Sequence, residues 1–187
     1  MRLLQHSFEY WNHPATSETR DVRFVNNTCI NAGHGWGHAQ RPDPSGRHLC
    51  FYTSVAAQKG IVIANNIFFE AVTNAFYAPA WTPEAIAGLA CDHNLWFQKA
   101  GTMMAVAGKV YPMAEFARYQ AEQVQDVHSR LGEPGFVDAA KLDFHLAPGS
   151  PCIGAGEDFG PATDYAGVPI VAGRPPDIGA LRFAPRR

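Results

Sequence analysis

The chain has 187 residues, of which 47% are hydrophobic and 17% are charged, an ordinary globular composition that excludes a disordered chain. The formal net charge is −2, so nothing points to a nucleic acid or an anionic membrane as partner. No run of about 18 apolar residues is present, so we expect no membrane-spanning helix.

Three segments repeat one pattern, in which short apolar runs flank a polar pair that ends in Asn. They are VRFVNNTCIN (22–31), IVIANNIFFE (61–70) and LACDHNLWFQ (89–98), and RLLQHSFEYW (2–11) is a weaker copy. The second residue of the pair is Asn27, Asn66 or Asn94, with His6 in the weaker copy. A single unit of this length cannot bury its apolar face alone, so the pattern predicts units that stack on one another.

Each repeat predicts two short strands joined by a tight bend. Ile61 and Ile63 alternate as in a strand, and the pair Asn65–Asn66 supplies the bend. Asn tolerates the left-handed backbone conformation that a sharp corner requires. We expect the Asn side chains at successive corners to hydrogen-bond to one another along the stack.

Residues 1–110 are therefore predicted to form stacked units with two inserted loops. GHGWGHAQRPDPSGRHL (33–49) is rich in Gly, Pro and polar residues, and FYAPAWTPEAIAG (76–88) is shorter and interrupted by Pro. Loops on one side of a rigid stack commonly carry the function of repeat proteins.

Residues 111–187 are predicted to hold a helix and a closing segment of the same domain. The helix is expected over 112–131, because Pro112 suits its first turn and Gly132 suits the left-handed position after it. Its charged residues are expected on the solvent face: Glu115, Arg118, Glu122, Asp126 and Arg130. The remainder, rich in Gly and Pro, is expected to cover one end of the stack.

Three motifs finish the chain: GEPGFVD (132–138), DFHLAPGSPCIGAG (143–156) and DYAGVP…GRPPDIGAL (164–181). Together with the NNIF-type repeats, they resemble the C-terminal part of right-handed parallel β-helix proteins of the pectate-lyase-like superfamily. The resemblance implies an all-β fold, a right-handed parallel β-helix of few coils with one C-terminal helix and a looped cap. The superfamily includes lyases, hydrolases, epimerases and non-catalytic proteins, so the resemblance specifies an architecture and not an activity.

Proteins of this superfamily usually have more coils than this chain can form, and an N-terminal cap. We therefore expect either the C-terminal fragment of a longer protein, which we favour, or an open end that pairs with a second copy. The resemblance implies a secreted or periplasmic protein that acts on a polysaccharide or oligosaccharide, although the N-terminal residues show no signal peptide.

The loop 33–49 and its surroundings concentrate side chains that suit a sugar site. Aromatic rings stack on a pyranose, and Arg or His binds hydroxyls or a uronate carboxylate. A lyase needs a base for the proton α to that carboxylate and positive charge for the developing enolate. The candidate catalytic residues are His34, His38, Arg41, Asp43 and Lys59, and the candidate substrate-binding residues are Trp36, Arg47, His48 and Tyr52. The alternatives are a solvated loop whose histidines pack or cap, and a module that binds glycan without cleaving it.

The sequence predicts no metal site. His34 and His38 are interleaved with glycines and have no obvious third ligand, which argues against zinc. Calcium, which many related lyases use, needs clustered carboxylates and remains only a weak possibility. The coil region offers scattered ones: Asp21, Asp43, Glu70 and Asp92.

A glycoside hydrolase would need two carboxylates at a defined separation. Glu70 and Asp92 fall at different positions of their repeats, so nothing indicates that they converge. Lyase chemistry is slightly favoured, because it fits the basic, carboxylate-poor loop better. Four cysteines lack metal-binding spacing and are expected to be buried free thiols rather than two disulfides: Cys29, Cys50, Cys91 and Cys152.

Overall fold

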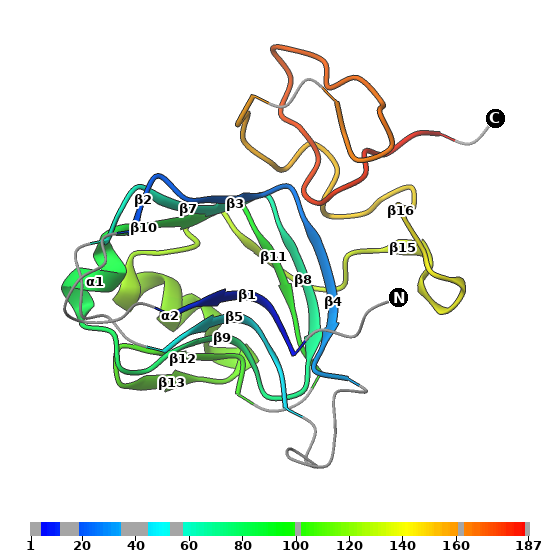
Figure 1. Cartoon of the computed structure of the whole chain (residues 1–187). Coiled ribbons are helices and arrows are strands. Elements are labelled where there is room, and N and C mark those ends of the chain that lie inside the picture. The colour runs from blue at the N-terminus through cyan, green and yellow to red at the C-terminus, as the bar shows by residue number, and fades with distance from the viewer. Residues whose placement is uncertain are drawn as a thin grey trace.

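The computed structural model describes residues 5–11, 19–34, 45–52, 58–99, 102–160 and 163–185. This part of the chain is mostly β with a few short helices, and most of its strand pairs are parallel (Figure 1). The predicted all-β class is confirmed at this level. No helix within these ranges is long and apolar enough to cross a membrane.

The repeats supply successive strands to three sheets. The first sheet contains β3 (Arg23–Val25), β7 (Ile61–Ala64) and β10 (Leu89–Asp92). The second contains β4 (Thr28–Ala32), β8 (Ile67–Ala71), β11 (Leu95–Phe97) and β14 (Arg130–Leu131). The third contains β1 (His6–Tyr10), β5 (Arg47–Phe51), β9 (Asn74–Ala78) and β12 (Met104–Val106), with β13 (Lys109–Tyr111) added antiparallel. A further pair joins β2 (Thr19–Arg20) to β6 (Gln58–Lys59).

The polar pairs form the corners between the first and second sheets. Their first residues, Asn26, Asn65 and His93, have φ angles of 57°, 55° and 53°, in the left-handed region. Each pair ends one strand and starts the next, so β3 leads to β4, β7 to β8 and β10 to β11. The predicted corners are confirmed for the three repeats. The prediction for the weaker copy was wrong, because His6 begins β1 and pairs with Arg47 of β5 in the third sheet.

The second residues of the pairs form a hydrogen-bonded ladder between repeats. Asn27 donates through Nδ2 to Oδ1 of Asn66 at 2.9 Å, and Asn66 donates to Oδ1 of Asn94 at 3.1 Å. The backbone N–H of Asn94 then donates to Oγ of Ser129 at 2.8 Å, which extends the ladder to a fourth corner. Asn66 and Asn94 are fully buried, and these bonds replace the water that their amides lose. The predicted ladder is confirmed.

Rows of apolar side chains fill the space between the three sheets. The main cluster includes Leu49, Phe51, Ile63, Phe76 and Met104. Phe68 stacks on Trp96 with ring centroids 4.3 Å apart, because equivalent positions of adjacent repeats lie one above the other. This buried row holds the strands of successive repeats together through the hydrophobic effect.

The helix predicted over 112–131 is much shorter in the structure. A 3₁₀ turn (Met113–Glu115) leads into α2 (Phe116–Gln123), and Val124 has a left-handed φ of 52° that ends it. The chain then builds the fourth corner and β14, and Asp126 is fully buried there. The expected solvent exposure of Asp126 was therefore wrong.

The two predicted loops also contain regular structure. The segment 33–49 includes the start of β5, and the segment 76–88 includes the end of β9 and a short helix, α1 (Pro83–Ala87). Thr82 caps α1 by accepting the backbone N–H of Ala85.

The closing segment lies beside the stack, whereas we expected it at one end (Figure 1). It begins with a hairpin of β15 (Phe136–Asp138), a 3₁₀ turn (Ala139–Lys141) and β16 (Asp143–Leu146). Farther on, the N–H of Glu157 donates to Oδ1 of Asn65 at 2.9 Å, and the N–H of Ala180 donates to Oγ1 of Thr28 at 3.0 Å. These side-chain acceptors at the corners explain the lateral placement. A second apolar cluster lies beneath: Ile67, Leu95, Leu146, Cys152 and Ile178.

Candidate functional site

The outer face of the five-stranded sheet gathers aromatic and charged side chains. Glu9, Cys50, Tyr77 and Ala105 are partners across β1, β5, β9 and β12. Their neighbours in the same strands point into the core, so these four positions face outward. Cys50 is nevertheless fully buried.

Larger side chains cover Cys50 and form the surface. The guanidinium carbon of Arg47 lies 4.0 Å from the centroid of the Tyr77 ring, a cation–π contact. Oη of Tyr52 lies 3.1 Å from Nε2 of His6. Trp11, 77% exposed, lies 6.1 Å from Tyr52 between ring centroids. We call the following six residues the β1–β5–β9 surface: His6, Glu9, Trp11, Arg47, Tyr52 and Tyr77.

The electrostatics of this surface favour a neutral phenol beside a fixed cation. Burial raises the pKa of Tyr52 to about 12, with further contributions from Cys50 and Glu9. Tyr52 therefore remains protonated at neutral pH and can act as a hydrogen-bond donor. Burial also raises the pKa of the Cys50 thiol, which is accordingly unreactive.

The structure brings two of the predicted substrate-binding residues, Arg47 and Tyr52, to this surface. His34 is exposed, in the turn after β4. A Cβ atom added to Gly33 would lie 2.4 Å from the carbonyl oxygen of Ser45. The backbone at Gly33 and the backbone at Ser45 are therefore in close contact. The intervening candidates Trp36, His38, Arg41 and Asp43 lie outside the described residues.

The other two predicted residues lie elsewhere. His48 is fully buried, with Nδ1 3.0 Å from Oγ of Ser7 and its ring 5.4 Å from that of Phe68. Burial lowers the pKa of His48 to about 3, so it is a neutral core residue that a substrate cannot reach. Lys59 is exposed in the two-stranded sheet, not in the sheet that holds Arg47.

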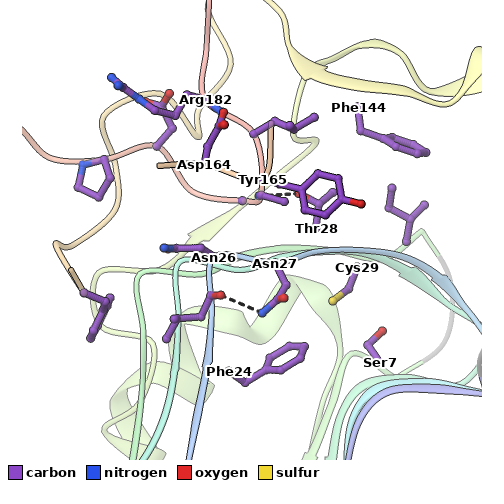
Figure 2. Close-up of a pocket in the computed structure, with 18 of the residues that line it drawn as sticks. Ser7, Phe24, Asn26, Asn27, Thr28, Cys29, Phe144, Asp164, Tyr165 and Arg182 are labelled. Carbon is purple, nitrogen blue, oxygen red and sulfur yellow. Dashed lines mark hydrogen bonds between the residues drawn. The ribbon is translucent and has the colours of Figure 1, made fainter. Parts of the chain in front are cut away.

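A separate cavity of about 1030 Å³ lies between the β3–β4 edge and the closing segment. Figure 2 shows Asn26, Asn27 and Thr28 on one side, with Asp164, Tyr165 and Arg182 opposite. The Asp164 carboxylate accepts backbone N–H groups from Ala166, Val168 and Arg182. Its oxygens are thus committed to the local turn, and this wall offers little for catalysis.

The Asn ladder ends at this cavity with Asn27. β3 and β4 are the edge strands of their sheets. Oδ1 of Asn66 and of Asn94 each accept two N–H groups from the preceding repeat. No described residue donates to Oδ1 of Asn27, so this edge is suited to receive another β segment.

The two carboxylates considered for a hydrolase each form a separate ion pair. Glu70 forms an ion pair with Lys99 at 3.7 Å, whereas Asp92 pairs with His128 at 2.6 Å. All four cysteines are free thiols, three of them buried and Cys29 half-buried, which confirms the expectation against disulfides. Within the described ranges, the one group of three potential metal ligands is Asp92, His93 and His128, which sequence reasoning missed.

The chain matches no known protein family, no curated protein and no solved structure.

Proposed function

We propose that this chain is a right-handed parallel β-helix of the pectate-lyase-like type that binds and cleaves an acidic polysaccharide or oligosaccharide on its β1–β5–β9 surface. The passage of each repeat through the same three sheets supports the architecture. The Asn ladder supports it further, because its members lie at corresponding corners of successive repeats. The closing motifs resemble the segment that finishes β-helices of this superfamily. Export to the periplasm or the exterior is part of this proposal.

The observation that carries the binding function is the contact between Arg47 and Tyr77, both half-buried, on the outer face of the five-stranded sheet. The ring holds the guanidinium in place, so the fork of N–H donors loses little freedom when it pairs with a carboxylate. Tyr52 and Trp11 supply adjacent rings that can stack on the apolar face of a sugar. A uronate is bound by both groups, because its carboxylate pairs with a guanidinium and its sugar face stacks on an aromatic ring.

Lyase chemistry suits this surface better than hydrolysis. A base removes the proton α to the uronate carboxylate, the C–O bond to the leaving sugar breaks, and a carbon–carbon double bond forms. Arg47 would neutralise the carboxylate as charge develops on it. His34, His38, Arg41 and Asp43 remain the candidates for the base or the proton donor. His6 is buried, and its Nδ1 accepts the backbone N–H of Arg47, so it positions Tyr52 through Nε2. Lys59 and His48 are no longer candidates for this surface.

The test is incubation with polygalacturonate, alginate and a neutral glucan, followed by mass spectrometry of the products. Oligosaccharides lighter by one water than hydrolytic products would identify a lyase, and full-mass products a hydrolase. Arg47→Lys should weaken binding of the acidic polymers about tenfold or more, because it loses the planar fork. Lys59→Ala serves as the control. Absence of both products and binding would refute the proposal.

A second candidate function is a non-catalytic β-helix module that binds glycan or assembles end to end. The observation that favours assembly is the open β3–β4 edge, where no described residue donates to Oδ1 of Asn27. Binding without any product, with retention of binding after His6→Ala, would favour the glycan-binding module. A concentration-dependent dimer disrupted by Thr28→Pro would favour assembly, because Pro removes an N–H from the edge strand.

A further inference from the structure

Two histidines lie one above the other where the last two corners of the stack meet. His93 is the first residue of its polar pair, and His128 directly precedes Ser129, the last member of the ladder. Their rings stack with centroids 5.0 Å apart and an interplanar angle of 15°. The register of neighbouring repeats therefore brings the two imidazoles together. The residues that directly follow them, Asn94 and Ser129, are 35 positions apart in sequence.

Asp92 adds a carboxylate to the pair. Its Oδ2 lies 2.6 Å from Nδ1 of His128. Its Oδ1 accepts the backbone N–H groups of His93 at 2.8 Å and of His128 at 2.7 Å, which anchors the side chain. One potential ligand atom from each of the three residues lies within 4.8 Å of the others.

The second nitrogen of His93 is positioned for a ligand. Nδ1 of His93 lies 3.2 Å from the carbonyl oxygen of Ala155, which can only accept, so Nδ1 carries the proton. In the neutral imidazole the lone pair is then on Nε2, which lies 3.8 Å from Oε2 of Glu157. A hydrogen bond from the far ring nitrogen to a carbonyl is the usual support of a metal-ligating histidine.

We propose that Asp92, His93 and His128 bind a divalent transition-metal ion such as Zn²⁺, with Glu157 as a fourth ligand. Two imidazoles and two carboxylates suit a four-coordinate zinc site with bonds of about 2.0–2.2 Å. Ligand atoms of such a site lie closer together than 4.8 Å, so side chains must rotate inward. The side chains of His128 and Glu157 are 66% and 59% exposed and are free to do so.

The surroundings give the ion access. His93 and Glu157 line an open surface hollow together with Asp158 and Arg174. Asp158 adds negative charge at the rim, whereas Arg174 opposes it. This site is independent of the β1–β5–β9 surface and does not rest on the proposed polysaccharide chemistry.

The chain supplies a matched control for a simple His–Asp pair. Nδ1 of His145 lies 2.6 Å from Oδ1 of Asp143, the same separation as in the His128–Asp92 pair. Among the described residues no second histidine joins this pair in a three-ligand group. His145→Ala therefore removes an equivalent ion pair without touching the proposed site.

The test titrates the chelator-treated chain with ZnCl₂ by calorimetry and with CoCl₂ by visible absorption. We expect one equivalent of metal, intense d–d bands typical of four-coordinate cobalt, and a higher thermal midpoint with zinc. His93→Ala, His128→Gln and Asp92→Asn should each weaken binding at least about tenfold, and His145→Ala should leave it unchanged.

Folding of each variant is checked by circular dichroism without metal, and His128→Gln is the safest variant because that side chain is exposed. The proposal is overturned if the wild-type protein binds no metal. It is equally overturned if both histidine variants keep the wild-type affinity, since binding would then belong to other residues.

Discussion

Asp126 is a buried carboxylate held by neutral donors alone. Its Oδ1 accepts Nε1 of Trp96 at 2.9 Å and Oγ of Ser129 at 2.5 Å, and its Oδ2 accepts Oη of Tyr119 at 2.9 Å. Burial raises its pKa, and these hydrogen bonds oppose the rise. The residue ties α2 to the third and fourth corners, because its partners come from both.

Asp126→Asn should destabilise the fold strongly. The amide nitrogen cannot accept from Tyr119 or Trp96, so at least one buried donor loses its partner at a cost of about 3 kcal/mol. Urea unfolding measures the change in the free energy of unfolding. Asp138→Asn, which alters a capping carboxylate near the surface, is the control. A loss below about 1 kcal/mol for Asp126→Asn would show that the network is dispensable.

His48 should make stability fall in mild acid. Its folded pKa is about 3, against 6.5 for the free side chain, chiefly through burial, and the charge of nearby His34 adds to the effect. Between pH 6.5 and pH 3 the unfolded chain therefore binds a proton at His48 and the folded chain does not. The free energy of unfolding consequently decreases as the pH falls from 6.5 toward 3. At pH 5 the loss attributable to His48 is about 2 kcal/mol.

The measurement is the free energy of unfolding at pH 7.5 and pH 5 for the wild type and for His48→Gln. Gln can still hydrogen-bond to Ser7, and it does not titrate. The variant should lose most of the acid dependence, whereas His145→Gln, at an exposed site, should keep it. An unchanged pH dependence in His48→Gln would contradict the assignment of this buried histidine.

At the level of elements, the end of α2 shows where periodicity misleads. Apolar residues at three- and four-residue steps continue past Gln123, so the spacing predicted a helix to 131. Val124, 73% exposed, instead takes a φ of 52° and turns the chain into the fourth corner. The signal that was available is the likeness of DVHSRL (126–131) to CDHNLW (91–96), with His followed by a small polar residue in both.

Val124→Gly should stabilise the protein. A β-branched side chain with positive φ is strained by about 1–2 kcal/mol, and glycine relieves that strain while the exposed valine gives up little packing. We expect a gain of about 1 kcal/mol, measured as a shift in thermal midpoint. Val127→Gly is the control, because Val127 is exposed without a positive φ and should lose stability. A less stable Val124→Gly protein would contradict the strain.

At the level of the whole molecule, the repeats predicted the corners, the ladder and the parallel stacking, because those follow from short-range residue spacing. The position of the closing segment depends on hydrogen bonds that Asn65 and Thr28 accept from backbone N–H groups far along the chain, and no local pattern encodes them. The same limit applies to the candidate sites. Arg47 meets Tyr77, and His93 meets His128, only through the register of neighbouring coils.

The closing segment should unfold together with the stack rather than as a separate unit. Ile178 is fully buried and packs in one cluster with Ile67 and Leu95 of the second sheet, and Gly179 donates its N–H to the carbonyl of Asn65. Ile178→Ala should therefore lower global stability by about 3 kcal/mol. Tryptophan fluorescence, which includes buried Trp96 of the main cluster, and circular dichroism should report one shared transition.

Val171→Ala, at a half-exposed position of the same segment, should change stability by less than about 0.5 kcal/mol. If Ile178→Ala shifted only a minor transition and left the tryptophan signal unchanged, the closing segment would be an independently unfolding appendage. The lateral contacts at Thr28 and Asn65 argue against that outcome, because unfolding the segment would strip hydrogen-bond partners from the corners of successive coils.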